Sequence, residues 1–172
     1  MKKNATNATF GTCLITALKI WGSAWAGMLV TILPMYIHRG LNKTHDASMQ
    51  MIENAIIATV GLLASSVILM FLVSRSDETE KWKPSECWKV AGISVGIYSF
   101  AWLLWWIFSG NPSVISPCGI YISFLIGQAK EELPTFSGTI LGILIYGAFY
   151  VAAIVLGRML ARLRLTKRRE KM

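Results

Sequence analysis

One cysteine of the chain stands in the stretch KWKPSECWK, residues 81–89, together with two tryptophans, three lysines and a proline. Neighbouring lysines lower a thiol pKa, so Cys87 is a candidate for thiol chemistry, although no histidine is close in sequence. The same stretch would also suit half of a metal site, a partner-docking loop or a loop that lies against lipid. The other cysteines, Cys13 and Cys118, offer no CxxC pair, and the count is odd, which argues against a disulfide framework.

A second group of candidate ligands lies in HRGLNKTHD, residues 38–46. A zinc site needs three or four ligands at favourable geometry, and His38, His45 and Asp46 in a loop that we expect to be flexible are a weak signal for one. We therefore interpret them as solvated loop residues and expect no metal and no cofactor. The sequence contains no G-x-S-x-G, P-loop, H-E-x-x-H or paired-carboxylate arrangement, so no residue is predicted to be catalytic.

Lys19 is the only ionised residue inside a long apolar stretch, and such residues are functional candidates by default. One interpretation is that its side chain snorkels to the headgroups. The other is a buried cation that binds an anionic substrate or a carboxylate of a partner helix. No Asp or Glu falls within any apolar stretch, which argues against a self-sufficient proton-coupled transporter.

The composition of the chain indicates the environment in which these residues lie. Of the 172 residues, 54% are apolar and 15% are charged, against about a quarter charged in soluble domains. A helix needs about 20 apolar residues to cross a bilayer. Stretches at about residues 14–36, 54–74, 90–109 and 135–157 approach or pass that length. They predict an all-α, polytopic integral membrane protein with four transmembrane helices in a compact bundle, forming a single domain.

The basic residues predict the orientation. With four spans, thirteen Lys and Arg residues would share the side of the two termini and of residues 75–89, against three on the other side. The positive-inside rule then places both termini in the cytoplasm, and we expect the plasma membrane. Residues 115–128 are too short for a fifth span, which would also weaken this charge bias. They are predicted to form an interfacial or re-entrant half-helix in the outer loop.

In this topology KWKPSECWK precedes the third span on the cytoplasmic side. Tryptophan prefers the membrane interface, and lysine stems can lie along lipid while their ammonium groups reach phosphates. Pro84 is expected to interrupt any helix. The predicted interface anchors are Trp82, Trp88, Lys81, Lys83 and Lys89.

The C-terminal segment 158–172 continues the fourth span into a basic tail. We expect this tail to bind anionic cytoplasmic headgroups or an acidic partner. The formal net charge of +8 follows from this orientation, so nucleic acid is not an expected partner. The basic residues of the tail are Arg158, Arg162, Arg164, Lys167, Arg168, Arg169 and Lys171.

Small residues recur four apart in every span, which gives smooth faces that allow close helix approach within one chain or between chains. Ser65, Ser66, Ser94 and Ser99 are candidates for interhelical hydrogen bonds. The predicted packing residues are Gly22, Ala26, Gly61, Ser65, Gly92, Gly96, Gly138 and Gly142, and the pair Ser23 and Gly27 follows the same spacing.

These patterns favour a non-enzymatic accessory, assembly or regulatory component that acts through helix packing and its basic tail. Its expected partners are the lipid bilayer and either another membrane protein or further copies of the chain. The alternative is a small oligomeric transporter or channel subunit with Lys19 and residues 115–128 near the path. A membrane enzyme is the third hypothesis.

Overall fold

A computed structural model describes residues 10–41, 47–76, 79–109 and 136–169, and within these residues it contains helices and short turns but no strand. The helices are α1 (Phe10–Leu41), α2 (Ala47–Ser74), the short 3₁₀ helix η1 (Thr79–Lys81), α3 (Pro84–Ser109) and α5 (Phe136–Arg169). Each of the four long apolar stretches in the sequence is therefore helical. Continuous apolar sequence without a polar face suits a helix, because a helix satisfies its backbone groups internally.

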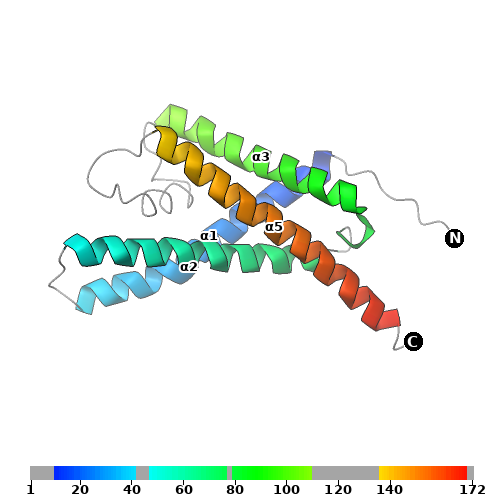
Figure 1. Ribbon diagram of the computed structural model, residues 1–172, viewed down its shortest axis with the longest axis horizontal. Helices are drawn as coiled ribbons and strands as arrows, with labels where there is room; N and C mark the ends of the chain where they lie inside the picture. The colour runs from blue at the N-terminus through cyan, green and yellow to red at the C-terminus, as the bar shows by residue number, and fades with distance from the viewer. Residues whose placement is uncertain (1–9, 42–46, 77–78, 110–135, 170–172) are drawn as a thin grey trace.

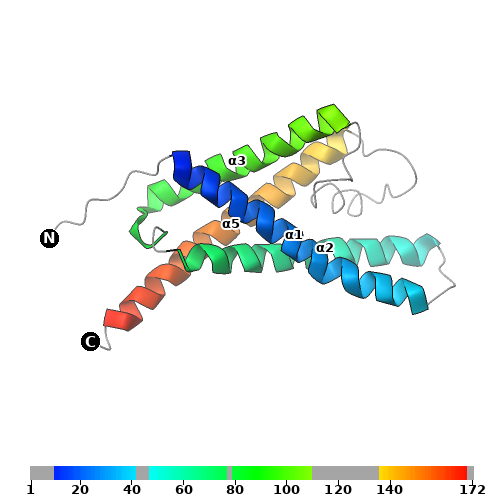
Figure 2. The ribbon, with the colours of Figure 1, turned by 180° about the vertical axis from the view of Figure 1, so that it is seen from behind.

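The four long helices run alternately in opposite directions (Figures 1 and 2). The start of α1, the connection between α2 and α3, and the end of α5 consequently lie at one end of the molecule, which we call the terminal end. Each helix packs mainly on two others: α1 on α2 and α3, and α5 on α2 and α3. The core thus lies inside a ring of four helices, with α1 opposite α5 and α2 opposite α3.

The backbones of α1 and α2 approach each other closely at Gly27. A Cβ atom built on Gly27 would lie 2.7 Å from the Gly61 carbonyl oxygen and 2.7 Å from the Cβ of Ser65. Only a residue without a side chain allows the two backbones to approach this closely. The small residues at these three positions therefore set the distance between α1 and α2.

A second close approach joins α2 and α5. A Cβ on Gly157 would lie 2.7 Å from the Met70 carbonyl oxygen and 3.0 Å from Val73. On the other side of the ring, Ser94 of α3 donates a buried hydrogen bond of 2.9 Å to the Cys13 carbonyl oxygen of α1. This bond confirms the interhelical role expected of Ser94. Ser65 differs, since its hydroxyl bonds to Leu62 of its own helix at 2.9 Å.

Aromatic side chains fill the contact between α3 and α5. Tyr98 and Tyr150 meet edge to face with ring centroids 5.8 Å apart, and Tyr146 lies 6.2 Å from Tyr150. All three rings are buried. Such arrangements contribute about 0.5–1.5 kcal/mol beyond the area that they bury.

The start of α3 differs from the expectation that Pro84 would only interrupt a helix. Pro84 is the first residue of α3, where its missing N–H costs nothing and its fixed φ suits the helix. The Glu86 carboxylate accepts a hydrogen bond from the Lys83 N–H at 2.8 Å, and the Cys87 N–H donates to the Lys83 carbonyl at 3.0 Å. Lys83 is therefore the N-cap, and the helix begins six residues before the predicted span.

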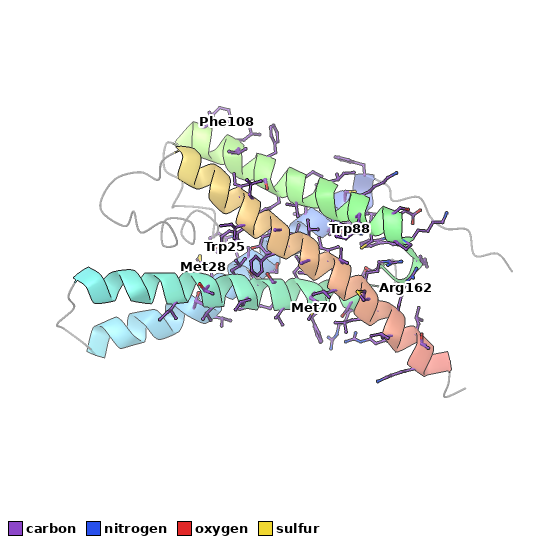
Figure 3. All side chains as sticks on the ribbon, in the orientation of Figure 1. Trp25, Met28, Met70, Trp88, Phe108 and Arg162 are labelled. Atoms are coloured by element: carbon purple, nitrogen blue, oxygen red, sulfur yellow. The ribbon has the colours of Figure 1, made fainter. Side chains whose placement is uncertain are left out.

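The outward faces of all four helices are apolar. Exposed large side chains include Leu18 on α1, Val67 on α2, Phe108 on α3 and Leu156 on α5, and Figure 3 shows Phe108 projecting from the far end of α3. Two helices contain apolar stretches long enough to cross a membrane, Phe10–Thr31 in α1 and Ile143–Lys167 in α5. In α2 the apolar stretch Thr59–Ser74 is shorter.

Candidate functional site

At the terminal end, the main-chain carbonyl of Trp82 accepts hydrogen bonds from two arginine side chains. Arg158 donates to it from Nε at 3.1 Å and from Nη2 at 2.9 Å. Arg162 donates to the same oxygen from Nη2 at 3.2 Å. In Figure 3, Arg162 extends from α5 toward the connection between α2 and α3. A single neutral oxygen therefore accepts hydrogen bonds from two guanidinium groups.

Local structure explains this convergence. Arg158 and Arg162 are four residues apart on α5, so they share one face of the helix. Gly157 brings α5 against α2 one residue earlier, which places Arg158 beside η1. The Trp82 side chain is 5% exposed and Arg158 is 7% exposed, so both are fixed inside the protein. Arg162 is exposed, and it forms the solvent side of the pair.

The two guanidinium groups repel one another. Their Nη2 atoms both lie within 3.2 Å of the Trp82 oxygen, so they are at most about 6 Å apart. At that distance two unit charges repel by roughly 1–3 kcal/mol for an effective dielectric of 80 to 20. The Glu86 carboxylate, in the described part of the chain, accepts a hydrogen bond from the Lys83 N–H and forms no ion pair with either arginine. Within the described residues, the positive charge of the two guanidinium groups is therefore incompletely balanced.

A second arginine pair lies nearby on an aromatic ring. The guanidinium carbon of Arg75 is 4.1 Å from the centroid of the Phe71 ring, and that of Arg164 is 5.6 Å from it. Cation–π contacts stabilise a guanidinium without neutralising it. We call Arg75, Arg158, Arg162 and Arg164 the arginine cluster. It joins the end of α2 to the last turns of α5.

Cys87 lies beside this cluster and is 1% exposed. Burial raises the pKa of the Cys87 thiol above its ordinary value, and the positive charges of Arg158 and Arg162 offset only part of the rise. A buried thiol that remains protonated is a poor nucleophile and a poor metal ligand. The surroundings of Cys87 thus suit a packed core residue rather than thiol chemistry.

The residues predicted to anchor the chain at a membrane interface have different environments. Trp88 is 60% exposed, and its ring projects from α3. Trp82 is enclosed by the protein and supplies its carbonyl to the arginines. The side chains of Lys81, Lys83 and Lys89 are exposed. The structure contains no membrane, so the anchoring role of these five residues stays a prediction.

The predicted basic tail is helical as far as Arg169. Lys167 is exposed, Arg168 and Arg169 are the last residues of α5, and Lys171 lies outside the described residues. Arg158 belongs to the packed part of α5 rather than to a free tail.

The predicted packing residues fall into two groups. Gly61 and Ser65 contact Gly27, as described above, whereas a Cβ on Gly22, Gly92 or Gly96 would meet no described atom within 4 Å. Ala26 is half-buried. Gly138 and Gly142 lie in α5, outside the side chains that the structure describes.

The structure describes less of the remaining predicted positions. Lys19 is half-buried near the middle of the stretch Phe10–Thr31. The surroundings of His38, His45 and Asp46, and the half-helix 115–128, lie outside what the structure describes. In the described part of the chain, no three His, Cys, Asp or Glu side chains form a group that could hold a metal ion.

Sequence reasoning did not identify the Trp82 carbonyl, the Phe71 ring or the three tyrosines as places where helices meet. A backbone carbonyl has no residue type to signal it. The spacing of Arg158, Arg162 and Tyr146, Tyr150 on one helix was visible, but the partner of each was not.

Comparisons with known protein families, with curated proteins and with solved structures found no match for this chain.

Proposed function

We propose that this protein is a four-span integral membrane protein and a non-enzymatic accessory, assembly or regulatory component. In this proposal the open face of α3 binds another membrane protein or a second copy. The terminal end faces the cytoplasm and lies against anionic headgroups.

The apolar exterior supports the membrane location. Contiguous apolar surface of this kind is rare on soluble monomers. With 28 residues in α2 and 26 in α3, both helices are about 40 Å long, which exceeds the roughly 30 Å of a hydrocarbon core. Their lengths are thus compatible with spans, alongside α1 and α5.

The observation that carries the proposal is the contrast between the glycines. Gly27 and Gly157 each meet a neighbouring backbone, which gives a packing reason for glycine. Gly92 and Gly96 are exposed on one face of α3, and no described atom approaches them. Glycine inside a helix costs about 1 kcal/mol relative to alanine. A helix from outside the chain would offset that cost by close packing.

The charge distribution supports the orientation. Residues 75–89 and 158–171 contain eleven basic and five acidic residues. Because both segments lie at the terminal end, the positive-inside rule favours the cytoplasmic side for that end.

The test combines extraction with substitutions on α3. The full chain is extracted at its natural level into lipid-preserving particles, and the proteins in each particle are identified by mass spectrometry. We expect a stoichiometric second protein, or a second copy, with the unaltered chain and its loss with Gly92→Leu and Gly96→Leu. Ala152→Leu is the matched control, because Ala152 is an exposed small residue on α5 that does not belong to the open glycine face of α3.

A particle that holds a single copy of this chain alone would contradict the proposal. So would equal retention of the partner by the α3 variants and by Ala152→Leu. Thermal unfolding of each variant shows that a lost partner does not reflect a lost fold.

A small oligomeric transporter or channel is the second candidate function. It is favoured by the position of Lys19 near the middle of the Phe10–Thr31 stretch, where an ionised side chain is expensive in lipid and usually functional. A ligand-dependent rise in thermal stability that disappears in Lys19→Ala and persists in Lys19→Arg would support it.

A further inference from the structure

We propose that Arg158 and Arg162 form a binding site for a phosphate group, carried either by an anionic lipid headgroup or by a soluble phosphate compound. The site lies between the last turns of α5 and the connection from η1 to α3. The lipid source rests on the membrane location proposed above, whereas the soluble source does not.

Both guanidinium groups have unused hydrogen-bonding capacity. A guanidinium has five N–H donors. Arg158 directs two hydrogen bonds and Arg162 directs one to the Trp82 carbonyl. The described residues supply no further hydrogen bond to either group. Several donors on two adjacent guanidiniums thus remain for a ligand that can accept many hydrogen bonds.

The positive charge of Arg158 and Arg162 also favours an anion. No described carboxylate forms an ion pair with Arg158 or Arg162. The Glu86 carboxylate accepts a hydrogen bond from the Lys83 N–H. Arg75 and Arg164 add positive potential from the Phe71 ring. An anion would relieve the repulsion between the two guanidiniums.

Among anions, a phosphate group fits the two arginines best. A carboxylate is planar and matches the fork of one arginine, whereas a tetrahedral phosphate can accept from two guanidiniums that approach from different directions. The pair also directly follows the predicted span 135–157. If α5 crosses a bilayer, this is the level of the headgroup phosphates.

Arg158 is held in place by the protein, whereas Arg162 is accessible to solvent. Arg158 is buried and held by two hydrogen bonds to a buried tryptophan residue, so little conformational entropy is lost when it binds. Arg162 is exposed and can close on a ligand from the solvent side. In the same turn the Thr79 hydroxyl is buried without a described hydrogen-bond partner, so this turn also contains a polar group that the described protein does not satisfy.

The experiment uses the purified full chain in neutral detergent. Thermal unfolding is followed during titration with inorganic phosphate, with phosphatidylglycerol and with phosphatidylcholine. Native mass spectrometry measures the lipid that remains bound. Arg162→Gln is the main variant, because Arg162 is exposed and its loss should not prevent folding. Arg164→Gln is the matched control, since it removes the same charge from the same end of α5.

We expect a saturable stabilisation whose apparent affinity falls at least tenfold in Arg162→Gln and less than threefold in Arg164→Gln. Arg162→Lys should recover only part of the affinity, because lysine keeps the charge without the fork. Saturation by phosphatidylglycerol alone assigns the site to a lipid headgroup, and saturation by millimolar inorganic phosphate assigns it to a soluble phosphate.

Equal weakening in Arg162→Gln and Arg164→Gln would overturn the site, because it indicates only diffuse attraction. Absence of stabilisation by both anionic probes would overturn it as well. Alkaline carbonate extraction of cell membranes separates the two proposals. A chain released by carbonate contradicts the membrane location but leaves the inorganic phosphate titration as a valid test of the site.

Discussion

Arg158 of α5 donates two hydrogen bonds to the main-chain carbonyl of Trp82, 76 positions earlier in the chain. This contact closes the ring of helices at the terminal end, because it joins the last helix to the connection between the second and third. A charged side chain so deeply buried stabilises the fold only while its hydrogen bonds persist.

Arg158→Lys should destabilise the protein although it keeps the charge. Lysine cannot direct two N–H groups at one oxygen from this position, and hydrogen bonds from charged groups contribute about 1.5–3 kcal/mol each. We expect a loss of about 2 kcal/mol in the free energy of unfolding, measured by denaturant titration in mixed micelles. Arg164→Lys is the control and should change stability little. Equal stability of the two variants would show that the Trp82 contact contributes nothing.

Gly27→Ala should separate α1 from α2. The added Cβ would lie within 2.7 Å of the Gly61 oxygen and of the Ser65 Cβ, and such overpacking costs about 1–3 kcal/mol. Gly22→Ala adds the same atom on the same helix where no described atom lies within 4 Å. It should leave stability unchanged or raise it by up to about 1 kcal/mol. Thermal unfolding of the two variants measures the difference, and a reversed order would refute this packing.

Ser94→Ala removes the hydrogen bond between α3 and α1. Interhelical hydrogen bonds of this kind average about 0.6 kcal/mol in membrane proteins, so we expect a small but measurable loss of stability. Ser23→Ala is the comparison, because the Ser23 hydroxyl bonds to the Ile20 carbonyl of its own helix at 2.8 Å. A larger loss for Ser23→Ala than for Ser94→Ala would argue against the interhelical bond.

Cys87 should react slowly with maleimide in the folded protein. Burial raises the pKa of its thiol, so the thiolate fraction at neutral pH is lower than for an exposed cysteine, and it increases as pH rises. The folded state disfavours the thiolate, so stability should fall as pH rises through the ordinary thiol range. Peptide mapping by mass spectrometry, between pH 7 and pH 9 with and without denaturant, measures the labelling rate. Fast labelling at pH 7 without denaturant would indicate a thiolate.

The helical class followed from the sequence because the apolar runs, when interpreted as membrane spans, leave the backbone no partner except its own helix. The start of α3 at Pro84 is also predictable from the sequence. Proline at the first helical position with an acidic residue in the first turn is a recognised helix start, but the prediction concerned only the apolar span from about residue 90 and not the start of the helix that contains it.

The sequence by itself determined the four helices, their apolar character and the gathering of basic residues in two segments, since each depends on residue type and local spacing. Only the tertiary structure decided which small residues meet a neighbour. Gly27 and Gly92 have similar sequence surroundings, yet α2 packs on one and no described atom approaches the other. It also decided that Trp82 receives Arg158 and Arg162, because a carbonyl acquires a partner only when another helix arrives beside it. Long-range contacts depend on how whole helices cross, and residue spacing along one helix does not specify that crossing.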